Sequence, residues 1–86
     1  MTSISTHASR PVAIVVTVNH REVTLTSREV TGLEVKQEAI AQGVAIDLAF
    51  QLSEKKGHKF HPVADTDSIR VHPGTEFRAV AGDDNS

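Results

Sequence analysis

The sequence contains no cysteine, tryptophan or tyrosine, and its only aromatic rings are Phe50, Phe60 and Phe77. Without cysteine, the chain can form no disulfide, no thiolate metal site and no thiol nucleophile. The shortage of aromatic rings also disfavours binding of single-stranded nucleic acid, whose bases stack on such rings. A chain without cysteine suits a reducing compartment, so we expect a cytoplasmic protein.

The sequence also has no large excess of positive or negative charge. Nine Lys and Arg residues stand against eleven Asp and Glu residues, which gives a formal net charge of -2. No basic cluster extends beyond Lys55, Lys56 and Lys59, whereas duplex binding needs a basic face that releases counterions. The longest apolar stretch, around Val12 to Val18, is too short to cross a bilayer. We therefore expect neither a nucleic-acid partner nor a membrane partner.

The length of 86 residues is enough for one domain. Residues 1–10 are small and polar, show no periodicity and contain no signal-peptide core, so we predict a disordered N-terminal lead. Residues 11–81 carry most of the apolar side chains and form the predicted domain. Residues 82–86 are polar, and we predict a flexible tail there.

Alternating β-branched residues predict strands before and after one helix. A short polar loop between the first two strands favours a hairpin, and Pro62 restricts its own segment to an edge or irregular strand. A turn of Pro and Gly, residues 72–75, precedes the last strand. The predicted strands are Pro11–Asn19, Glu22–Thr26, Leu48–Ser53, Phe60–Val63 and Phe77–Val80, with a charged turn over residues 54–59.

The start of the helix has the clearest signal in the chain. Thr31 followed by Glu34 three residues later is typical of a capping box, in which each side chain binds the other residue's backbone N–H. The helix then runs to Gln42, and Gly43 suits the left-handed residue after its end. We expect Lys36 to lay its stem along the core edge and to keep its charge in water.

This order of elements predicts a mixed sheet packed on one helix. The side chains that the sheet and the helix bury between them form the predicted core: Val12, Ile14, Val16, Val18, Val23, Leu25, Val35, Ala39, Leu48, Phe50, Leu52, Phe60, Ile69 and Phe77.

Catalytic and metal-binding motifs are weak in this sequence. His58, His61 and His72 lack a helix or thiol partners at ligand spacing, so solvated loop histidines are favoured over a zinc site. Serine, histidine and aspartate occur without the Gly-x-Ser-x-Gly context of a hydrolase. We predict no enzyme, no metal site and no cofactor.

The opening strands, the helix segment TGLEVKQEAIAQG, the segment FQLSEKKG and residues 65–77 together resemble the bacterial multiubiquitin-type ubiquitin-like proteins. The resemblance covers residues 11–86. It implies an α+β fold of the β-grasp type, a mixed four- to five-stranded sheet packed on one helix. It also implies a protein modifier handled by a ubiquitin-activating-like enzyme, a ubiquitin-conjugating-like enzyme and a zinc-dependent processing peptidase, for an unknown protein target. The chain has no Gly-Gly pair, so diglycine processing and sulfur-carrier chemistry do not fit.

The candidate conjugation and processing tail is Gly82, Asp83, Asp84, Asn85 and Ser86. Gly82 lets another backbone approach closely, and the two aspartates suit basic residues of an enzyme channel. We hypothesise that a peptidase removes Ser86 and that Asn85 becomes the reactive end. The alternative is an ordinary frayed acidic segment.

A candidate docking surface is formed by Ala49, Gln51, Arg78 and Val80, which alternate away from the predicted core. Ordinary solvated strand positions are the alternative for each of them. The sequence therefore leaves two functions open: a covalent modifier, or a non-covalent β-grasp interaction module that binds through its sheet or a strand edge.

Overall fold

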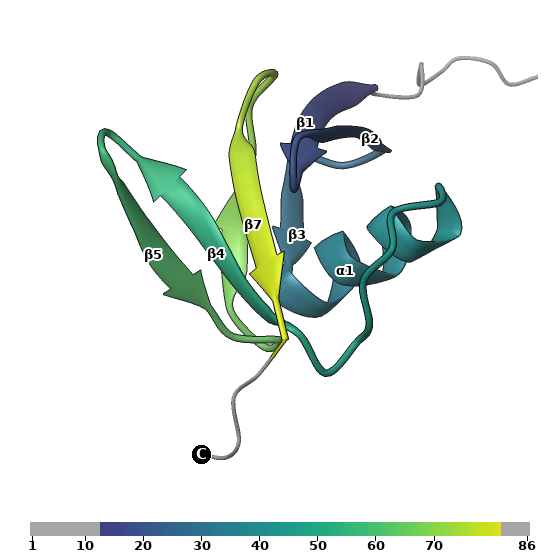
Figure 1. Ribbon diagram of the computed structural model, residues 1–86. Coiled ribbons are helices and arrows are strands. Elements are labelled where there is room, and N and C mark those ends of the chain that lie inside the picture. The colour runs from purple at the N-terminus through teal and green to yellow at the C-terminus, as the bar shows by residue number, and fades with distance from the viewer. Residues whose placement is uncertain (1–12, 82–86) are drawn as a thin grey trace, which may run out of the picture.

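The computed structural model describes residues 13–81. The predictions for the lead, for the tail and for Val12 lie outside this range. The elements in Figure 1 are β1 (Ile14–Val18), β2 (Arg21–Leu25), β3 (Glu29–Thr31), α1 (Gly32–Ala41), β4 (Gln51–Lys56), β5 (Lys59–Val63), β6 (Ser68–Arg70) and β7 (Glu76–Val80).

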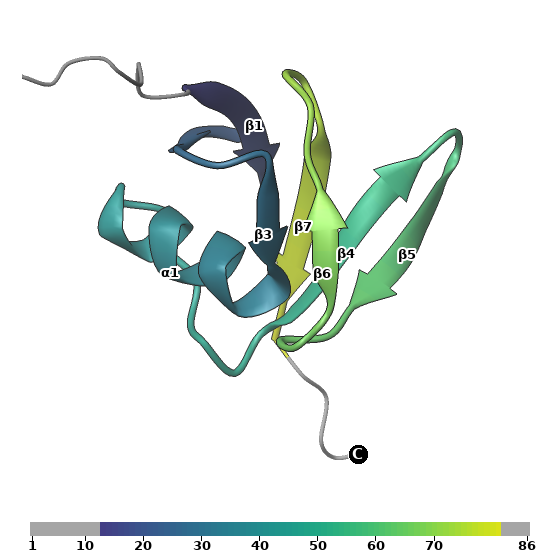
Figure 2. The same cartoon turned by 180° about the vertical axis from the view of Figure 1, so that it is seen from behind.

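The described elements form one five-stranded sheet in the order β2-β1-β7-β4-β5 and a two-stranded ribbon of β3 and β6. β1 and β7 are parallel, while the other neighbours in the sheet are antiparallel. Figures 1 and 2 show α1 and the ribbon on the same side of the sheet. We call this side the inner face and the opposite side the outer face. The predicted α+β fold with a mixed five-stranded sheet on one helix is confirmed.

The hairpin between β1 and β2 turns through Asn19 and His20, whose φ angles are 53° and 68°. Two left-handed residues match the twist of adjacent strands, as in type I′ turns. The Asn19 side chain also extends the pairing of β1 with β7, because its Nδ2 donates to Ala79 O at 2.9 Å and its Oδ1 accepts from Ala79 N at 2.9 Å. The sequence predicted the hairpin but not this side-chain link.

The predicted helix caps are confirmed. Thr31 Oγ1 accepts from Glu34 N at 3.2 Å, and Glu34 Oε1 accepts from Thr31 N at 2.8 Å. Gly43 follows the helix with a φ of 96°. Gln42, at the end of the helix, also reaches the edge strand β2, where its Oε1 accepts from Thr24 N and its Nε2 donates to Thr24 O, each at 2.8 Å. The helix end is thereby tied to the edge of the sheet.

The first turn of α1 packs against the segment after β5. Gly32 N donates to Asp67 O at 3.1 Å and Leu33 N donates to Asp65 O at 3.2 Å, so two backbone donors of the helix start are satisfied. A Cβ on the buried Gly32 would collide with the carbonyl oxygen of Ala64. Glycine is therefore required for this close approach of two backbones.

Lys36 corrects a prediction, because its charge does not stay in water. The residue is 4% exposed, and its Nζ donates to Leu48 O at 2.7 Å and to Phe50 O at 2.8 Å. The same Nζ forms an ion pair with Asp65 Oδ1 at 2.6 Å. The loops before β4 and after β5 thus supply the oxygen atoms that water would otherwise provide.

The predicted strand Leu48–Ser53 is displaced toward the C-terminus, since β4 spans Gln51–Lys56. Asp47 forms a turn instead: its carbonyl oxygen accepts from Phe50 N at 3.0 Å and its Oδ1 accepts from Ala49 N at 3.2 Å. Leu48 lies in this turn and is 44% exposed, so its assignment to the core is wrong. The predicted charged turn at residues 54–59 shortens to two residues between β4 and β5.

This register also moves Phe60 out of the core. Phe60 lies opposite Lys55, whereas Val63 lies opposite the buried Leu52. Side chains that face each other across a strand pair share one side of the sheet, so Phe60 is on the outer face and Val63 fills the core. The assignment of Phe60 to the core is wrong. The prediction that Pro62 lies in an edge strand is confirmed, because β5 ends the sheet.

The core lies between the inner face, α1 and the ribbon. Phe50 and Ile69, assigned to the core from the sequence, are only half-buried and pack against it. The core predicted from apolar alternation omitted buried residues that lie in short or irregular segments, such as Val30, Val44 and Val71. The buried apolar residues are Ile14, Val16, Val18, Val23, Leu25, Val30, Val35, Ala39, Val44, Leu52, Val63, Val71, Phe77 and Ala79.

Candidate functional site

Three of the four predicted docking residues lie together on the outer face. Gln51 of β4 lies directly opposite Val80 of β7, and Arg78 lies two residues before Val80 on the same face. Arg78 and Val80 are exposed because Phe77 and Ala79, which alternate with them in β7, point into the core. Gln51 is exposed because the next residue of β4, Leu52, is buried. Ala49 is exposed too, but it lies in the turn before β4 and not on a strand.

The outer face combines apolar and charged groups. The Arg78 guanidinium lies 4.2 Å from the centroid of the Phe60 ring, a distance suited to a cation–π interaction. Val80 is 48% exposed, and the Lys55 ammonium approaches a Glu76 carboxylate oxygen at 3.5 Å. A shallow cleft of about 330 Å³ runs beside Phe60, Arg78 and Val80. This surface suits a partner that offers an apolar group beside a carboxylate.

β7 leads the chain out of the sheet at Ala81, which is exposed. The pairing of Val80 with Gln51 places this exit beside the start of β4, and the pairing of Leu52 with Val63 places the end of β5 nearby. Figure 1 shows β7 ending where the connections into β4 and out of β5 meet. The predicted tail residues 82–86 lie outside the described residues.

A second cleft, of about 440 Å³, lies beside this exit, and we call it the exit cleft. The exposed Leu48 lies on its wall together with Ala49 and the half-buried Phe50. Ala49 therefore belongs to this cleft rather than to the outer face. The sequence missed Leu48 as a surface residue because the apolar alternation assigned it to the core. Its exposure next to the chain exit is the signal that identifies it here.

The candidate metal ligands do not gather. His58 lies in the β4–β5 turn, His61 in β5 and His72 in the loop before β7. Within residues 13–81 no group of three His, Asp or Glu side chains could hold a metal ion. Over the same part of the chain, no helix is long and apolar enough to cross a membrane.

The family comparison covers the whole described fold. The profile of the Multiubiquitin family matches residues 14–83, from the first residue of β1 past the end of β7. The chain belongs to the Multiubiquitin family. The comparison with curated proteins and the comparison with solved structures gave no match. This Multiubiquitin domain is a ubiquitin-like domain with a β-grasp fold, from a family that is typically non-catalytic.

Proposed function

We propose that this Multiubiquitin domain is a protein modifier that is attached to a target protein through residues 82–86. The observation that carries the proposal is the family match over residues 14–83, which includes the folded body and the first two residues of that segment. The exposed position of Ala81 at the end of β7 supports it, because an enzyme can reach the chain there without unfolding the sheet.

The chemistry is supplied by partner enzymes. A zinc-dependent peptidase hydrolyses the peptide bond after Asn85 and frees its α-carboxylate. An activating-like enzyme joins this carboxylate to the α-phosphate of ATP, which releases pyrophosphate. An enzyme thiol then displaces AMP, the thioester passes from the activating-like to the conjugating-like enzyme, and an amine or hydroxyl group of the target finally displaces the thiol. The domain contributes a substrate carboxyl group and no catalytic residue.

Two surfaces beside the chain exit support docking of such enzymes. The exit cleft, with Leu48 exposed, flanks the point where the chain leaves the fold. The outer face presents Arg78 and Val80 beside the same exit. In the segment that follows, Gly82 allows close backbone approach, and Asp83 and Asp84 suit basic residues of an enzyme channel.

Conjugation is tested by expressing the chain with an N-terminal affinity tag in its host and purifying it under denaturing conditions. Trypsin cuts after Arg78, so a modified target lysine should carry residues 79–85 as a branch. The variant without residues 83–86 is the control and should give no branched peptide. Branches that always retain Ser86 would contradict the processing step, and the absence of any adduct on peptides or proteins would contradict the modifier.

The outer face also favours a second function, a non-covalent interaction module. Its mixed apolar and charged surface would then be sufficient for partner binding. The same truncation separates the two functions. A modifier loses its adducts when residues 83–86 are removed, whereas an interaction module still binds its partner. The substitution Val80→Asp should abolish partner binding by the module.

A further inference from the structure

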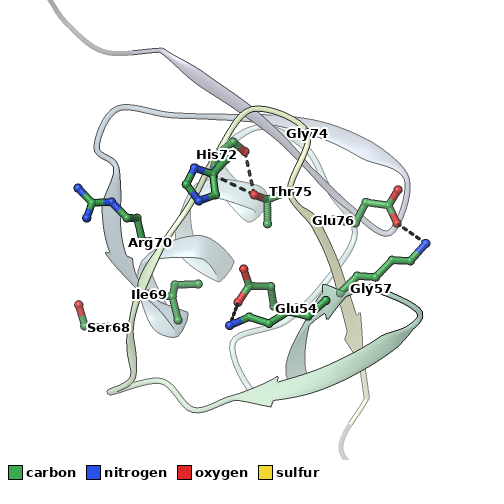
Figure 3. A pocket seen from close by; sticks show the side chains of 11 residues that line it. Glu54, Gly57, Ser68, Ile69, Arg70, His72, Gly74, Thr75 and Glu76 are labelled. Carbon is green, nitrogen blue, oxygen red and sulfur yellow. Dashed lines mark hydrogen bonds and ion pairs between the residues drawn. The ribbon is translucent and has the colours of Figure 1, made fainter.

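A third cleft, of about 690 Å³, lies on the inner face between the β4–β5 hairpin and the β3–β6 ribbon. We call it the ribbon cleft; Figure 3 shows it from close by. Its walls come from the end of β4, from β6 and from the loop that leads to β7. It opens near the start of β7, whereas the chain exits at the opposite end of that strand. The ribbon cleft therefore lies away from the chain exit, and it meets the outer face only at its rim, where Lys55 and Glu76 form their ion pair.

The ribbon cleft holds a buried carboxylate with an incomplete set of partners. The side chain of Glu54 is 10% exposed and points to the middle of the cleft in Figure 3. Its one ion pair among residues 13–81 is with Lys56 Nζ at 4.0 Å, and the Lys56 side chain is 65% exposed. Over the same residues, no hydrogen bond reaches the Glu54 carboxylate. Burial of a charge is costly unless a partner compensates it, so this site favours an incoming cation.

The cleft also contains an open strand edge. Val71 N donates to Arg28 O at 2.8 Å, and Gly32 N donates to Asp67 O at 3.1 Å. Residues 67 and 71, and Ile69 between them opposite Val30, therefore direct their backbone groups toward β3. Because hydrogen-bonded pairs alternate in an antiparallel ladder, the backbone groups of Ser68 and Arg70 point the other way. Among the described residues, these groups have no backbone partner, and both residues line the cleft.

We propose that the ribbon cleft binds an extended peptide of a partner protein, which adds as a strand to β6 and directs a lysine or arginine side chain to Glu54. The half-buried Ile69 provides an apolar wall for the aliphatic stem of that side chain. The next residue of an added strand points the opposite way, toward the side of the exposed Arg70. The peptide chemistry that fits is therefore a basic residue followed by an acidic one.

The charges of the rim select against purely basic peptides. Lys55, Lys56 and Arg70 all line the cleft and are exposed, so a run of lysines would meet repulsion there. The second carboxylate of the lining, Glu76, is exposed and already forms an ion pair with Lys55. Strand addition supplies backbone hydrogen bonds, and the alternating side chains supply the specificity. This docking mode needs no residue beyond Ala81 and is independent of the proposed conjugation.

The test is an NMR titration of the ¹⁵N-labelled full chain with two capped synthetic hexapeptides. One is Thr-Val-Lys-Glu-Val-Thr, and the other carries norleucine in place of lysine. We expect the lysine peptide to shift the amide signals of Ser68, Ile69 and Arg70 and to bind about tenfold more tightly, the typical minimum for pairing a buried charge. Glu54→Gln should remove this preference, while the matched charge change Glu22→Gln in the exposed part of β2 should preserve it.

The proposal is overturned by equal affinity for the two peptides, by a preference that survives Glu54→Gln, or by shifts confined to the outer face. The absence of any shift at roughly millimolar lysine peptide, the weak limit of specific docking, also overturns it. The comparison of the peptides on the unaltered chain needs no variant, so it decides the matter even if Glu54→Gln fails to fold. A chain lacking residues 83–86 should bind the lysine peptide unchanged, which separates this site from the conjugation proposal.

Discussion

Lys36 joins three segments of the fold through one ammonium group. The carbonyl oxygens of Leu48 and Phe50 belong to the turn before β4, and the carboxylate of Asp65 belongs to the segment after β5. The lysine side chain itself is 5% exposed, while that of Asp65 is 50% exposed. The carbonyl groups therefore matter more than the ion pair, because water can replace Lys36 at the half-exposed Asp65 more easily than at the two part-buried carbonyl contacts.

Lys36→Met should lower the free energy of unfolding by about 2–4 kcal/mol, since it keeps most of the stem but leaves two carbonyl oxygens without their charged donor. Asp65→Asn is the matched control and should cost about 1 kcal/mol or less, because a half-exposed ion pair contributes little. Urea unfolding followed by circular dichroism measures both. Equal losses for the two variants would show that the ion pair, and not the carbonyl contacts, holds these segments.

The sequence could not predict these residue-level contacts. Lys36 lies in the row of α1 next to Val35 and Ala39, a position that is equally compatible with a charge in water. Its burial depends on the turn at Asp47 and on Asp65, which are distant in the sequence. Glu54 was hidden for the same reason: it lies in a run of charged residues typical of a loop, yet β4 continues through it and directs it to the inner face.

At the scale of elements, the contact between the start of α1 and the segment after β5 sets how closely the helix approaches the ribbon. Two carbonyl groups of residues 65 and 67 accept from the first helix N–H groups, and Gly32 leaves room for them. Helix propensity alone would favour alanine over glycine by about 1 kcal/mol. At this position the collision with Ala64 opposes that preference.

Gly32→Ala should therefore destabilise the domain, by about 1–3 kcal/mol, because the added methyl group forces the two backbones apart. Gln37→Ala at an exposed site of the same helix tests propensity without the collision and should leave stability nearly unchanged. Differential scanning calorimetry of the two variants gives the comparison. A rise in Tm for Gly32→Ala would mean that the approach at Ala64 is looser than described.

The elements that the sequence predicted well are those with local signals. The capping box at Thr31, the first hairpin, the edge position of Pro62 and the last strand each depend on residues a few positions apart. The predicted location of β4 was wrong because the apolar alternation of the sequence continues through residues 48–50, which form a turn at Asp47 in the structure. β3 is three residues long and carried no pattern of its own. Of the four predicted docking residues, Gln51, Arg78 and Val80 share the outer face. Ala49 lies instead in the turn before β4, because β4 begins later than predicted.

At the scale of the whole molecule, two phenylalanines lie on opposite faces of the sheet. Phe77 is 3% exposed and lies in the core, while Phe60 lies half-buried on the outer face beneath Arg78. Both are phenylalanines in strands that flank β4, so they form a natural pair for comparison. Their difference follows from the register of β5 against β4 and not from their chemistry.

Phe77→Ala should cost about 3–5 kcal/mol and unfold much of the population, because it empties the centre of a small core. Phe60→Ala should cost about 1–2 kcal/mol, from the loss of partial burial and of the contact with Arg78. Thermal melts of both variants check this order. A larger loss for Phe60→Ala would contradict the observed register.

The two proposed binding regions lie at opposite ends of β7. The ribbon cleft lies near the start of β7 and the chain exits near its end, so one strand of five residues, about 16 Å long, separates them. A partner peptide on β6 and an enzyme at the exit could therefore occupy the domain together. Conjugation measured with and without a saturating amount of the lysine peptide should proceed at the same rate, and a peptide that blocks conjugation would show that the two regions overlap.

The contact of Gln42 with Thr24 has a consequence for crowded copies of this domain. An open β2 edge would offer hydrogen bonds to the same edge of a neighbouring copy, and such pairing is a common start of aggregation. The amide of Gln42 already occupies both backbone groups of Thr24 and acts as a one-residue extra strand. At the other margin, Pro62 of β5 has no N–H to offer. Crowded copies of the domain are thus hindered from joining through either edge of the sheet.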